Sequence, residues 1–166
     1  MSNATQILEF LYQGSYGDSL RERKNHVLGI THILNVKDSM RFEENKVIAS
    51  LHVSMSDYGD TDLRKVLPAC FNFIEKAREN HGKVLVHCRS GQNRSTTVVV
   101  AYLTFVHGLT LRESWHLVSQ RRPIVTITEQ YWRQLESLEK QLKNVSTFSV
   151  DEIKREIQEA LSKLES

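Results

Sequence analysis

Up to residue 87, the chain contains short apolar runs that are separated by polar, turn-forming positions. Each run is four to seven residues long and is bounded by Gly, Asn, Asp or Ser. Runs of this kind are typical of buried or half-buried β-strands. The pattern predicts strands at Ile7–Tyr12, His32–Val36, Val47–Val53 and Val84–His87.

Between and after these runs, apolar residues recur at spacings of three and four, which is typical of amphipathic helices. Several of these segments open on a Ser or Thr that can cap a helix. The predicted helices are Asp18–Val27, Leu63–Asn80, Arg94–Val106, Leu111–Gln120 and Thr128–Lys143. Strands alternating with helices indicate an α/β fold, with a central sheet flanked by helices.

A further helix is predicted at residues 149–165, beyond a polar stretch at 144–148. Ser149 and Glu152 have the spacing of a capping box. The apolar positions then form one stripe of Val150, Ile153, Ile157, Leu161 and Leu164. We expect this helix to lie outside the domain at 5–143 and to pack on a second copy or a partner rather than on its own domain. Residues 1–4, Met-Ser-Asn-Ala, are typical of a leader left by recombinant expression.

The segment from His87 to Thr96 follows the last predicted strand and leads into an apolar helix. A tight loop in this place directs successive backbone N–H groups inward, and Gly91 permits a backbone conformation that a side chain would hinder. The start of the helix adds unpaired donors and the positive end of its dipole. The sequence therefore predicts a phosphate-binding loop between strand and helix, formed by Arg89, Ser90, Gly91, Gln92, Asn93 and Arg94.

Cys88 and Arg94 are the candidate reactive residues of this loop. The planar guanidinium of Arg94 can make two parallel hydrogen bonds to phosphate oxygens. The same positive field favours the thiolate form of Cys88, because cysteines at helix N-termini beside cations ionise readily. Attack of this thiolate on phosphorus would form a cysteinyl-phosphate and expel an alkoxide or phenoxide.

The departing oxygen is a poor leaving group, so a general acid is needed. Asp57, Asp60 and Asp62 are the candidates, because they lie in a polar, Gly-containing segment between a strand and a helix, where a movable catalytic loop is expected. The same carboxylate could then direct water onto the intermediate. The hydroxyl of Ser95 could donate a hydrogen bond to the departing thiolate, besides capping its helix.

The pattern His-Cys-x-x-Gly-x-x-Arg-Ser after a Val-rich strand resembles the protein tyrosine phosphatase superfamily, and within it the small dual-specificity phosphatases. The similarity runs from Ile7 to Leu142. Besides the acidic segment and the Cys88 loop, it includes Leu11-Tyr12-Gln13-Gly14, Ile30–Val36, Ala101-Tyr102-Leu103, Arg121-Arg122-Pro123 and Tyr131–Leu135. The resemblance implies a protein-tyrosine-phosphatase-like fold, no cofactor, and hydrolysis of phosphotyrosine and phosphoserine or phosphothreonine in proteins.

The resemblance also selects among the candidate residues. In that family the acid precedes the cysteine by about the separation found between Asp57 and Cys88, which favours Asp57 and leaves Asp60 in reserve. His87 matches a residue that braces the loop, and Asn35 matches a strand residue that supports it from beneath; both would act as supporting residues. Gln92 and Asn93 depart from the usual residues, which puts the substrate preference in doubt rather than the chemistry.

Composition limits the setting and the partners. A formal net charge of +2 is too small for a general nucleic-acid binder, and no apolar run approaches the ~18 residues of a membrane span. We therefore expect phosphorylated proteins as partners, and neither nucleic acid nor a membrane. Two cysteines and no signal-peptide pattern predict a cytoplasmic or nuclear location. The seven histidines are scattered singly, so no metal site is predicted.

Two alternatives stay open from the sequence. The loop recognises phosphate and not the molecule that bears it, so the same chemistry could act on an RNA 5′-phosphate or a phosphoinositide. The chain could also be a phosphoprotein-binding module with little turnover, although the cysteine, arginine and acid are all present. Cys70 falls on the apolar stripe of its helix, and whether it forms a redox disulfide with Cys88 is left open.

Overall fold

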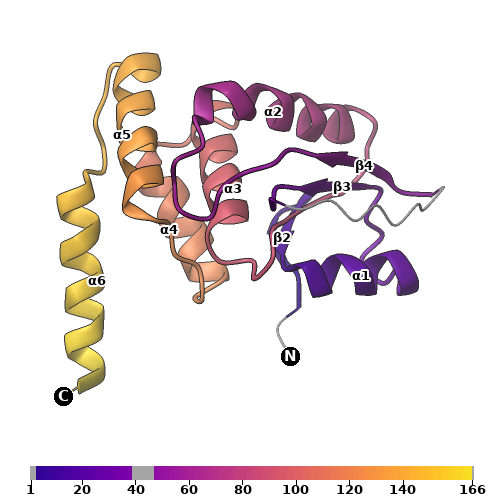
Figure 1. The fold of residues 1–166 in the computed structure, drawn as a ribbon, viewed down its shortest axis with the longest axis horizontal. Coiled ribbons are helices and arrows are strands. Elements are labelled where there is room, and N and C mark those ends of the chain that lie inside the picture. Colours follow the sequence, from indigo (N-terminus) through magenta and orange to yellow (C-terminus); the bar gives the residue numbers. More distant parts are fainter. Residues whose placement is uncertain (1–2, 39–46, 166) are drawn as a thin grey trace.

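The structure is a computed structural model that describes residues 3–38 and 47–165. Within these residues the strands form one five-stranded sheet in the order β1-β2-β5-β3-β4 (Figure 1). The strands are β1 (Thr5–Leu8), β2 (Leu11–Gly14), β3 (His32–Asn35), β4 (Ala49–His52) and β5 (Val84–His87). The helices are α1 (Tyr16–Asn25), α2 (Leu63–Glu79), α3 (Arg94–Phe105), α4 (Leu111–Arg121), α5 (Glu129–Lys143) and α6 (Val150–Glu165).

The sheet is parallel except for β1, which pairs antiparallel with β2. The register aligns Gly14 of β2, His87 of β5 and Asn35 of β3 as neighbours, so these strands end at one edge of the sheet. In open α/β sheets, ligands bind outside this carboxyl edge. The loop that begins at Cys88 leaves the central strand β5 at this place.

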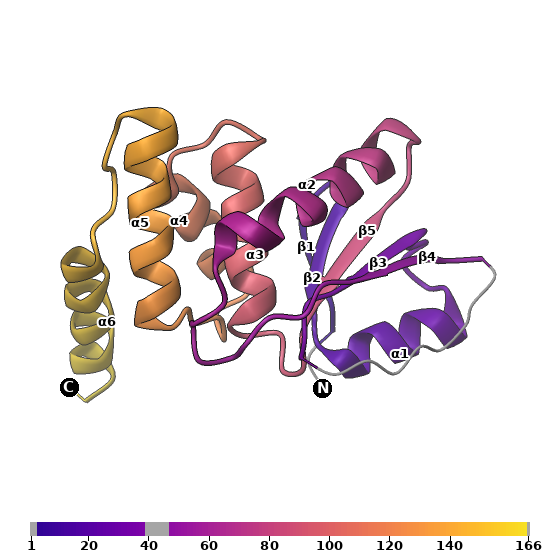
Figure 2. The same cartoon turned by 45° about the horizontal axis from the view of Figure 1, so that its top comes forward.

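Helices cover both faces of the sheet, as expected for an α/β fold. Figure 2 shows α1 on one face and α2 and α3 on the other, with α4, α5 and α6 stacked beyond them. Side chains of β5 alternate accordingly: Val84 and Val86 belong to the large core under the helices, whereas Leu85 packs on the opposite face with Ile33.

The predicted helices form within a few residues of their expected bounds, but the first predicted strand is wrong. Ile7–Tyr12 is not one strand, because the chain reverses at Glu9 and Phe10 and returns as β2. This turn lacks Gly, Pro, Asn and Asp, so the apolar run conceals it. Phe10 is fixed there by a hydrogen bond from the Val84 amide to its carbonyl oxygen and by edge-to-face contact with Tyr102.

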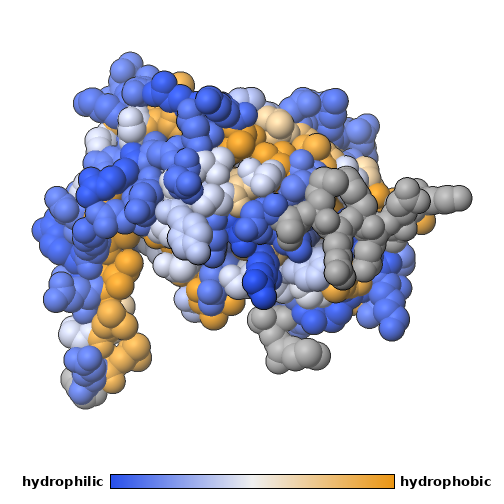
Figure 3. Space-filling model, in the orientation of Figure 1, coloured by the Kyte–Doolittle hydropathy of each residue, from blue (hydrophilic) through white to orange (hydrophobic). Residues whose placement is uncertain are grey.

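Helix α6 belongs to the domain at its start and leaves it towards its end (Figure 1). Phe148, Val150 and Ile153 are buried in the main core, so that core extends past residue 143, where we expected the domain to end. Arg112 of α4 also pairs with Glu152. Beyond this docked part, the stripe is exposed at Ile157, Leu161 and Leu164, and Figure 3 shows it as a hydrophobic band along the lower part of the helix.

Candidate active site

The segment between β5 and α3 is a tight loop that lies against the end of β2. Gly91 adopts a φ of +71°, and a Cβ atom at this position would lie 2.8 Å from the carbonyl carbon and oxygen of Gly14. The Tyr16 amide donates a hydrogen bond of 3.0 Å to the Arg89 carbonyl oxygen. Gly91 is therefore needed both for its backbone conformation and for the close approach of β2.

Two buried side chains support this loop from beneath, and the sequence did not reveal either. Gln13 Nε2 donates to Thr96 Oγ1 (2.7 Å), to Ser95 Oγ (3.2 Å) and to the Gly91 carbonyl oxygen (3.4 Å). Arg122 Nε donates to the same carbonyl oxygen at 2.9 Å. The only available signals were a glutamine inside an apolar strand and an arginine before a proline.

Arg122 also connects the loop to the beginning of the chain. Its Nη1 donates hydrogen bonds of 3.0 Å to the Asn3 carbonyl oxygen and to Thr5 Oγ1. Asn3 is exposed and lies in the segment that we set aside as a leader, yet its carbonyl oxygen accepts from the buried Arg122. One guanidinium thus links the N-terminal edge of the sheet to Gly91.

Cys88 and Ser95 lie together at the floor of the loop. Both are buried, and Cys88 Sγ lies 3.3 Å from Ser95 Oγ. Because Gln13 donates to Ser95 Oγ, the serine's own O–H is free to point at the sulfur. The pair can therefore stabilise a thiolate at Cys88.

His87 precedes the reactive cysteine and is also buried. Burial lowers its pKa to about 4, so the ring is neutral near pH 7. Its Nδ1 lies 3.1 Å from the Cys88 carbonyl oxygen, and since a carbonyl only accepts, Nδ1 carries the proton. His87 thus fixes the backbone of Cys88 rather than acting as a base.

Within the described residues, the side chain of Asn35 bonds a neighbour in its own segment rather than the loop. Its Oδ1 accepts a hydrogen bond of 2.9 Å from the Lys37 amide. The link from β3 to the loop is instead a backbone bond, from the Val36 amide to the His87 carbonyl oxygen. The side chains that contact the loop from beneath are Gln13 of β2 and Arg122, which directly follows α4.

Arg94 opens α3 and is almost completely buried, with a side chain 5% exposed. Its Nη1 donates to the Met55 carbonyl oxygen and lies 3.3 Å from Asp38 Oδ1. Its Nε lies 3.4 Å from Asp57 Oδ1, but makes no hydrogen bond within the described part of the chain. A buried guanidinium with an unused donor is poised to bind an anion. Asp38 was not among the residues that the sequence singled out.

The three candidate acids have different surroundings. Asp57 Oδ1 accepts a hydrogen bond of 3.0 Å from Asn93 Nδ2 and lies beside Arg94, while 59% of its side chain is exposed. Asp62 caps α2 by accepting from the Arg64 amide. Asp60 is exposed. The structure thus brings Asp57 to the phosphate loop, and Asp62 serves the adjacent helix.

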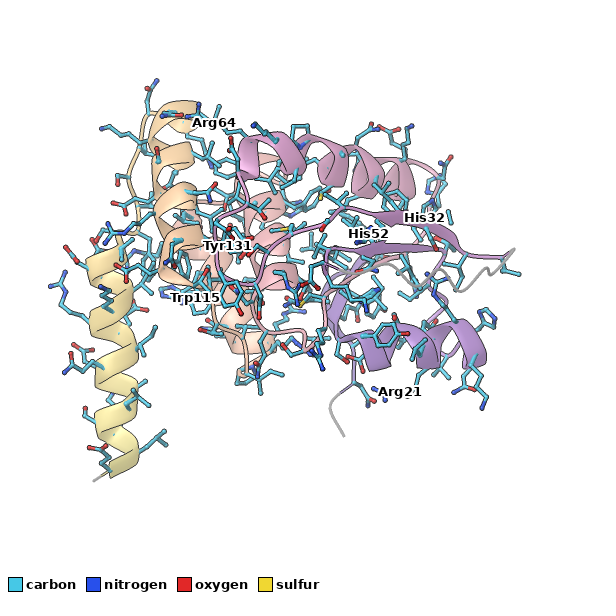
Figure 4. The ribbon with its side chains drawn as sticks, viewed as in Figure 1. Arg21, His32, His52, Arg64, Trp115 and Tyr131 are labelled. Atoms are coloured by element: carbon cyan, nitrogen blue, oxygen red, sulfur yellow. The ribbon has the colours of Figure 1, made fainter. Side chains whose placement is uncertain are left out.

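The acid loop, residues 56–62, is tied to α5. Tyr131 points from α5 towards this segment, and its hydroxyl donates to the Ser56 carbonyl oxygen (Figure 4). Gln134 Nε2 donates to the carbonyl oxygens of Gly59 (3.1 Å) and Thr61 (2.9 Å). We expected a movable loop here; these contacts instead anchor it at several points.

The described residues include no cluster of three or more His, Cys, Asp or Glu side chains that could hold a metal ion. Among the described helices, none combines the length and apolar character needed to span a bilayer.

Comparison with known proteins decides the family. The model of the dual specificity phosphatase catalytic domain matches residues 11–141. The chain belongs to the dual specificity phosphatase family. Its described sheet, helices and loop accordingly form a dual-specificity protein phosphatase catalytic domain of the protein-tyrosine-phosphatase-like fold, as the resemblance implied.

Individual relatives agree with this assignment. Dual specificity protein phosphatase 1 of Arabidopsis thaliana is 36% identical over 136 residues, which cover 82% of this chain and 69% of that protein. The crystal structure of DUSP15 superposes with a TM-score of 0.77 at 31% identity, covering 83% of this chain and 88% of that one. Human DUSP28 gives a TM-score of 0.79 at 26% identity, with coverages of 86% and 97%.

The shared length ends before the tail. The family match stops at residue 141, whereas α6 begins at Val150. The chain spans 56% of the length of mouse dual specificity protein phosphatase 15, so relatives of this family carry further sequence outside the shared part. The role of α6 therefore has to be argued from the residues of this chain and not from the family match.

Proposed function

We propose that this domain hydrolyses phosphotyrosine and phosphoserine or phosphothreonine in proteins through a cysteinyl-phosphate at Cys88. The observation that carries the proposal is the buried Arg94, whose Nε–H is unused and which closes the loop that begins at Cys88. A dianionic phosphate monoester would supply an acceptor oxygen for this donor and further acceptor oxygens for the amides of the loop. Arg94 would bind two phosphoryl oxygens and stabilise the charge that develops on them.

In the first step the thiolate of Cys88 forms an S–P bond while the ester P–O bond breaks. Asp57 gives its proton to the departing oxygen, so the leaving group departs as an alcohol or phenol. In the second step the Asp57 carboxylate takes a proton from water, whose oxygen attacks phosphorus. The S–P bond breaks, inorganic phosphate leaves, and the thiolate returns with a hydrogen bond from Ser95.

The supporting roles follow from the contacts. His87 would hold the Cys88 backbone, and Gln13 and Arg122 would hold the Gly91 carbonyl oxygen so that the loop amides face inward. Arg89, Ser90 and Gln92 are exposed around the entrance and would meet the substrate's flanking residues. Asn35 would act locally, through the hydrogen bond that its Oδ1 accepts from the Lys37 amide.

One experiment separates this proposal from its alternatives. Turnover of phosphopeptides, RNA 5′-phosphate ends and phosphoinositides would be compared under one set of conditions, with vanadate inhibition of an aryl phosphate as the test of chemistry. We expect the phosphopeptides to give the highest kcat/KM. Preference for RNA ends or inositol lipids would overturn the protein substrate and keep the mechanism. Tight phosphopeptide binding without turnover would favour the binding module.

The exposed half of α6 supports a second proposal, which concerns self-association of the chain. Its exposed Ile157, Leu161 and Leu164 continue the stripe that is buried at Val150 and Ile153. We propose that a second copy of the chain covers this exposed half of the helix. Phosphorylated proteins would be substrates of the active site and would not bind to this helix. The corresponding measurement is given in the Discussion.

A further inference from the structure

Asn93 occupies the N-cap of α3 but does not cap it. Asparagine is among the preferred N-cap residues because its side-chain oxygen accepts a hydrogen bond from the first turn. Here the side chain makes no such bond, although the residue is only 6% exposed. A buried amide costs free energy unless its polar groups are paired, so the partners that it has instead require an explanation.

These partners lie on two other segments. Asn93 Nδ2 donates to the backbone oxygen of Asp57 and to Asp57 Oδ1, both at 3.0 Å. Asn93 Oδ1 accepts from the Thr128 amide, also at 3.0 Å. One buried side chain therefore joins the phosphate loop to the acid loop and to the start of α5.

We propose that Asn93 is the positioning residue of the general acid: it holds Oδ1 of Asp57 as an acceptor and leaves Oδ2 to carry the proton. This inference rests on the proposed role of Asp57. Oδ1 accepts the N–H of the Asn93 amide and faces the positive guanidinium of Arg94, so it is unsuited to hold a proton. The bond to the Asp57 carbonyl oxygen fixes the backbone from which the carboxyl group extends.

A purely structural role for Asn93 fits the contacts less well. The acid loop is already fastened at Ser56, Gly59 and Thr61 by Tyr131 and Gln134. Asn93 adds contacts to the acid loop at a single residue, which is the candidate acid. Its loss should therefore disturb the direction of one carboxyl group more than the path of the loop.

The test compares two substrates with Asn93→Ala. One is a phosphothreonine peptide, whose alkoxide needs a proton, and the other is an aryl phosphate with an acidic phenol, which does not. We expect kcat to fall by about 10- to 100-fold for the peptide, a part of the 10²–10⁴-fold value of general acid catalysis, and by less than about threefold for the aryl phosphate. KM should change little for either substrate.

A double-mutant cycle makes the test specific to Asp57. In an Asp57→Asn background there is no acid to position, so Asn93→Ala should add less than about a twofold further loss on the peptide. Thr104→Val is the matched control, because Thr104 is a buried residue of the same helix that bonds the Val100 carbonyl oxygen and Ser114 Oγ. It should leave the ratio of the two activities unchanged.

Three outcomes would overturn the inference. Equal losses on both substrates would place Asn93 in the support of the phosphate loop. An undiminished loss in the Asp57→Asn background would show that Asn93 acts independently of Asp57. If Asn93→Ala does not fold, Asn93→Ser takes its place, and unchanged peptide turnover in that variant would count against the inference. Failure of the proposed function would be seen separately, as an Asp57→Asn variant that treats both substrates alike.

Discussion

Nε of Arg94 and Oδ1 of Asp57 lie 3.4 Å apart, so the group proposed to bind phosphate and the group proposed to donate the proton are in direct ionic contact. A phosphoryl group bound by Arg94 would bring its ester oxygen beside this carboxyl group. Binding and proton transfer would then be arranged by one contact, because the same guanidinium faces both partners. The predictions below test the parts of this arrangement.

Cys88→Ser should abolish turnover and keep phosphate binding, since a hydroxyl is a far poorer nucleophile and the backbone loop is unaffected. We expect a residual kcat below about one thousandth of wild type, because loss of a nucleophile usually costs several orders of magnitude. Steady-state turnover and vanadate titration measure the two effects. Cys70→Ala is the control: burial raises the pKa of Cys70 to about 12, so its thiol is not reactive at neutral pH. Turnover at a tenth of wild type in Cys88→Ser would refute the covalent mechanism.

Asp57→Asn should lower kcat by about 10²–10⁴-fold on a phosphopeptide and far less on an activated aryl phosphate, since only the former needs the proton. The basic limb of the pH–rate profile should disappear with it. Asp60→Asn is the matched control from the same loop and should behave as wild type. If Asp60→Asn gave the loss instead, the acid would have been assigned to the wrong carboxylate.

Asp38→Asn should strengthen substrate binding. Asp38 places a negative charge 3.3 Å from Arg94 Nη1, where it opposes an incoming phosphate. Its side chain is 72% exposed, so solvent weakens the effect, and we expect KM to fall by only about two- to fivefold at low salt. The difference should shrink as ionic strength rises. A KM that rises, or a change independent of salt, would show that Asp38 helps to hold Arg94 in place.

His87 should make the domain less stable in mild acid. Its pKa is about 4 in the folded chain, against 6.5 for an ordinary histidine, so the unfolded chain binds more protons between these values. The free energy of unfolding should therefore fall as pH drops from 6.5 to 4, with ~3 kcal/mol due to this group. Urea unfolding across that range measures the slope. A His87→Gln variant should show a shallower slope, and an identical slope would contradict the assignment.

Two truncations separate the parts of α6. Ending the chain after Lys143 removes Phe148, Val150 and Ile153 from the core and should lower the free energy of unfolding by about 3 kcal/mol or more. Ending it after Glu156 removes only the exposed part and should leave stability and aryl-phosphate turnover nearly unchanged. If a second copy covers that part, light scattering should show a lower molar mass for the shorter chain than for the full chain. Equal masses would exclude this assembly.

Local patterns in the sequence predicted most of the fold. The helices were predicted because capping residues and apolar spacing act within one segment, as in the capping box of Thr110 and Glu113 that opens α4. The reversal at Glu9 and Phe10 was missed because it depends on contacts with β5 and α3, which are distant in sequence. The docking of Phe148 was missed for the same reason.

The residues of the candidate site also fall into two groups: those that a local motif reveals and those that only the fold brings together. Cys88, Arg94 and Ser95 lie in one short motif, so the sequence alone could group them. Gln13 and Arg122 reach the Gly91 carbonyl oxygen from opposite ends of the domain, and neither carries a local signal of that contact. The role of Asn93 also depends on where residue 57 lies in space, which spacing along the chain does not reveal.

The link that Arg122 makes between Gly91, Asn3 and Thr5 has a practical consequence for producing this protein. A purification tag or protease site fused close to Thr5 could displace this residue. Thr5 bonds Arg122, and Arg122 also bonds the Gly91 carbonyl oxygen of the reactive loop. Removing Asn3 or Thr5 would take away a hydrogen-bond acceptor of Arg122. Kinetic constants from proteins with differently processed N-termini therefore refer to loops that are supported differently.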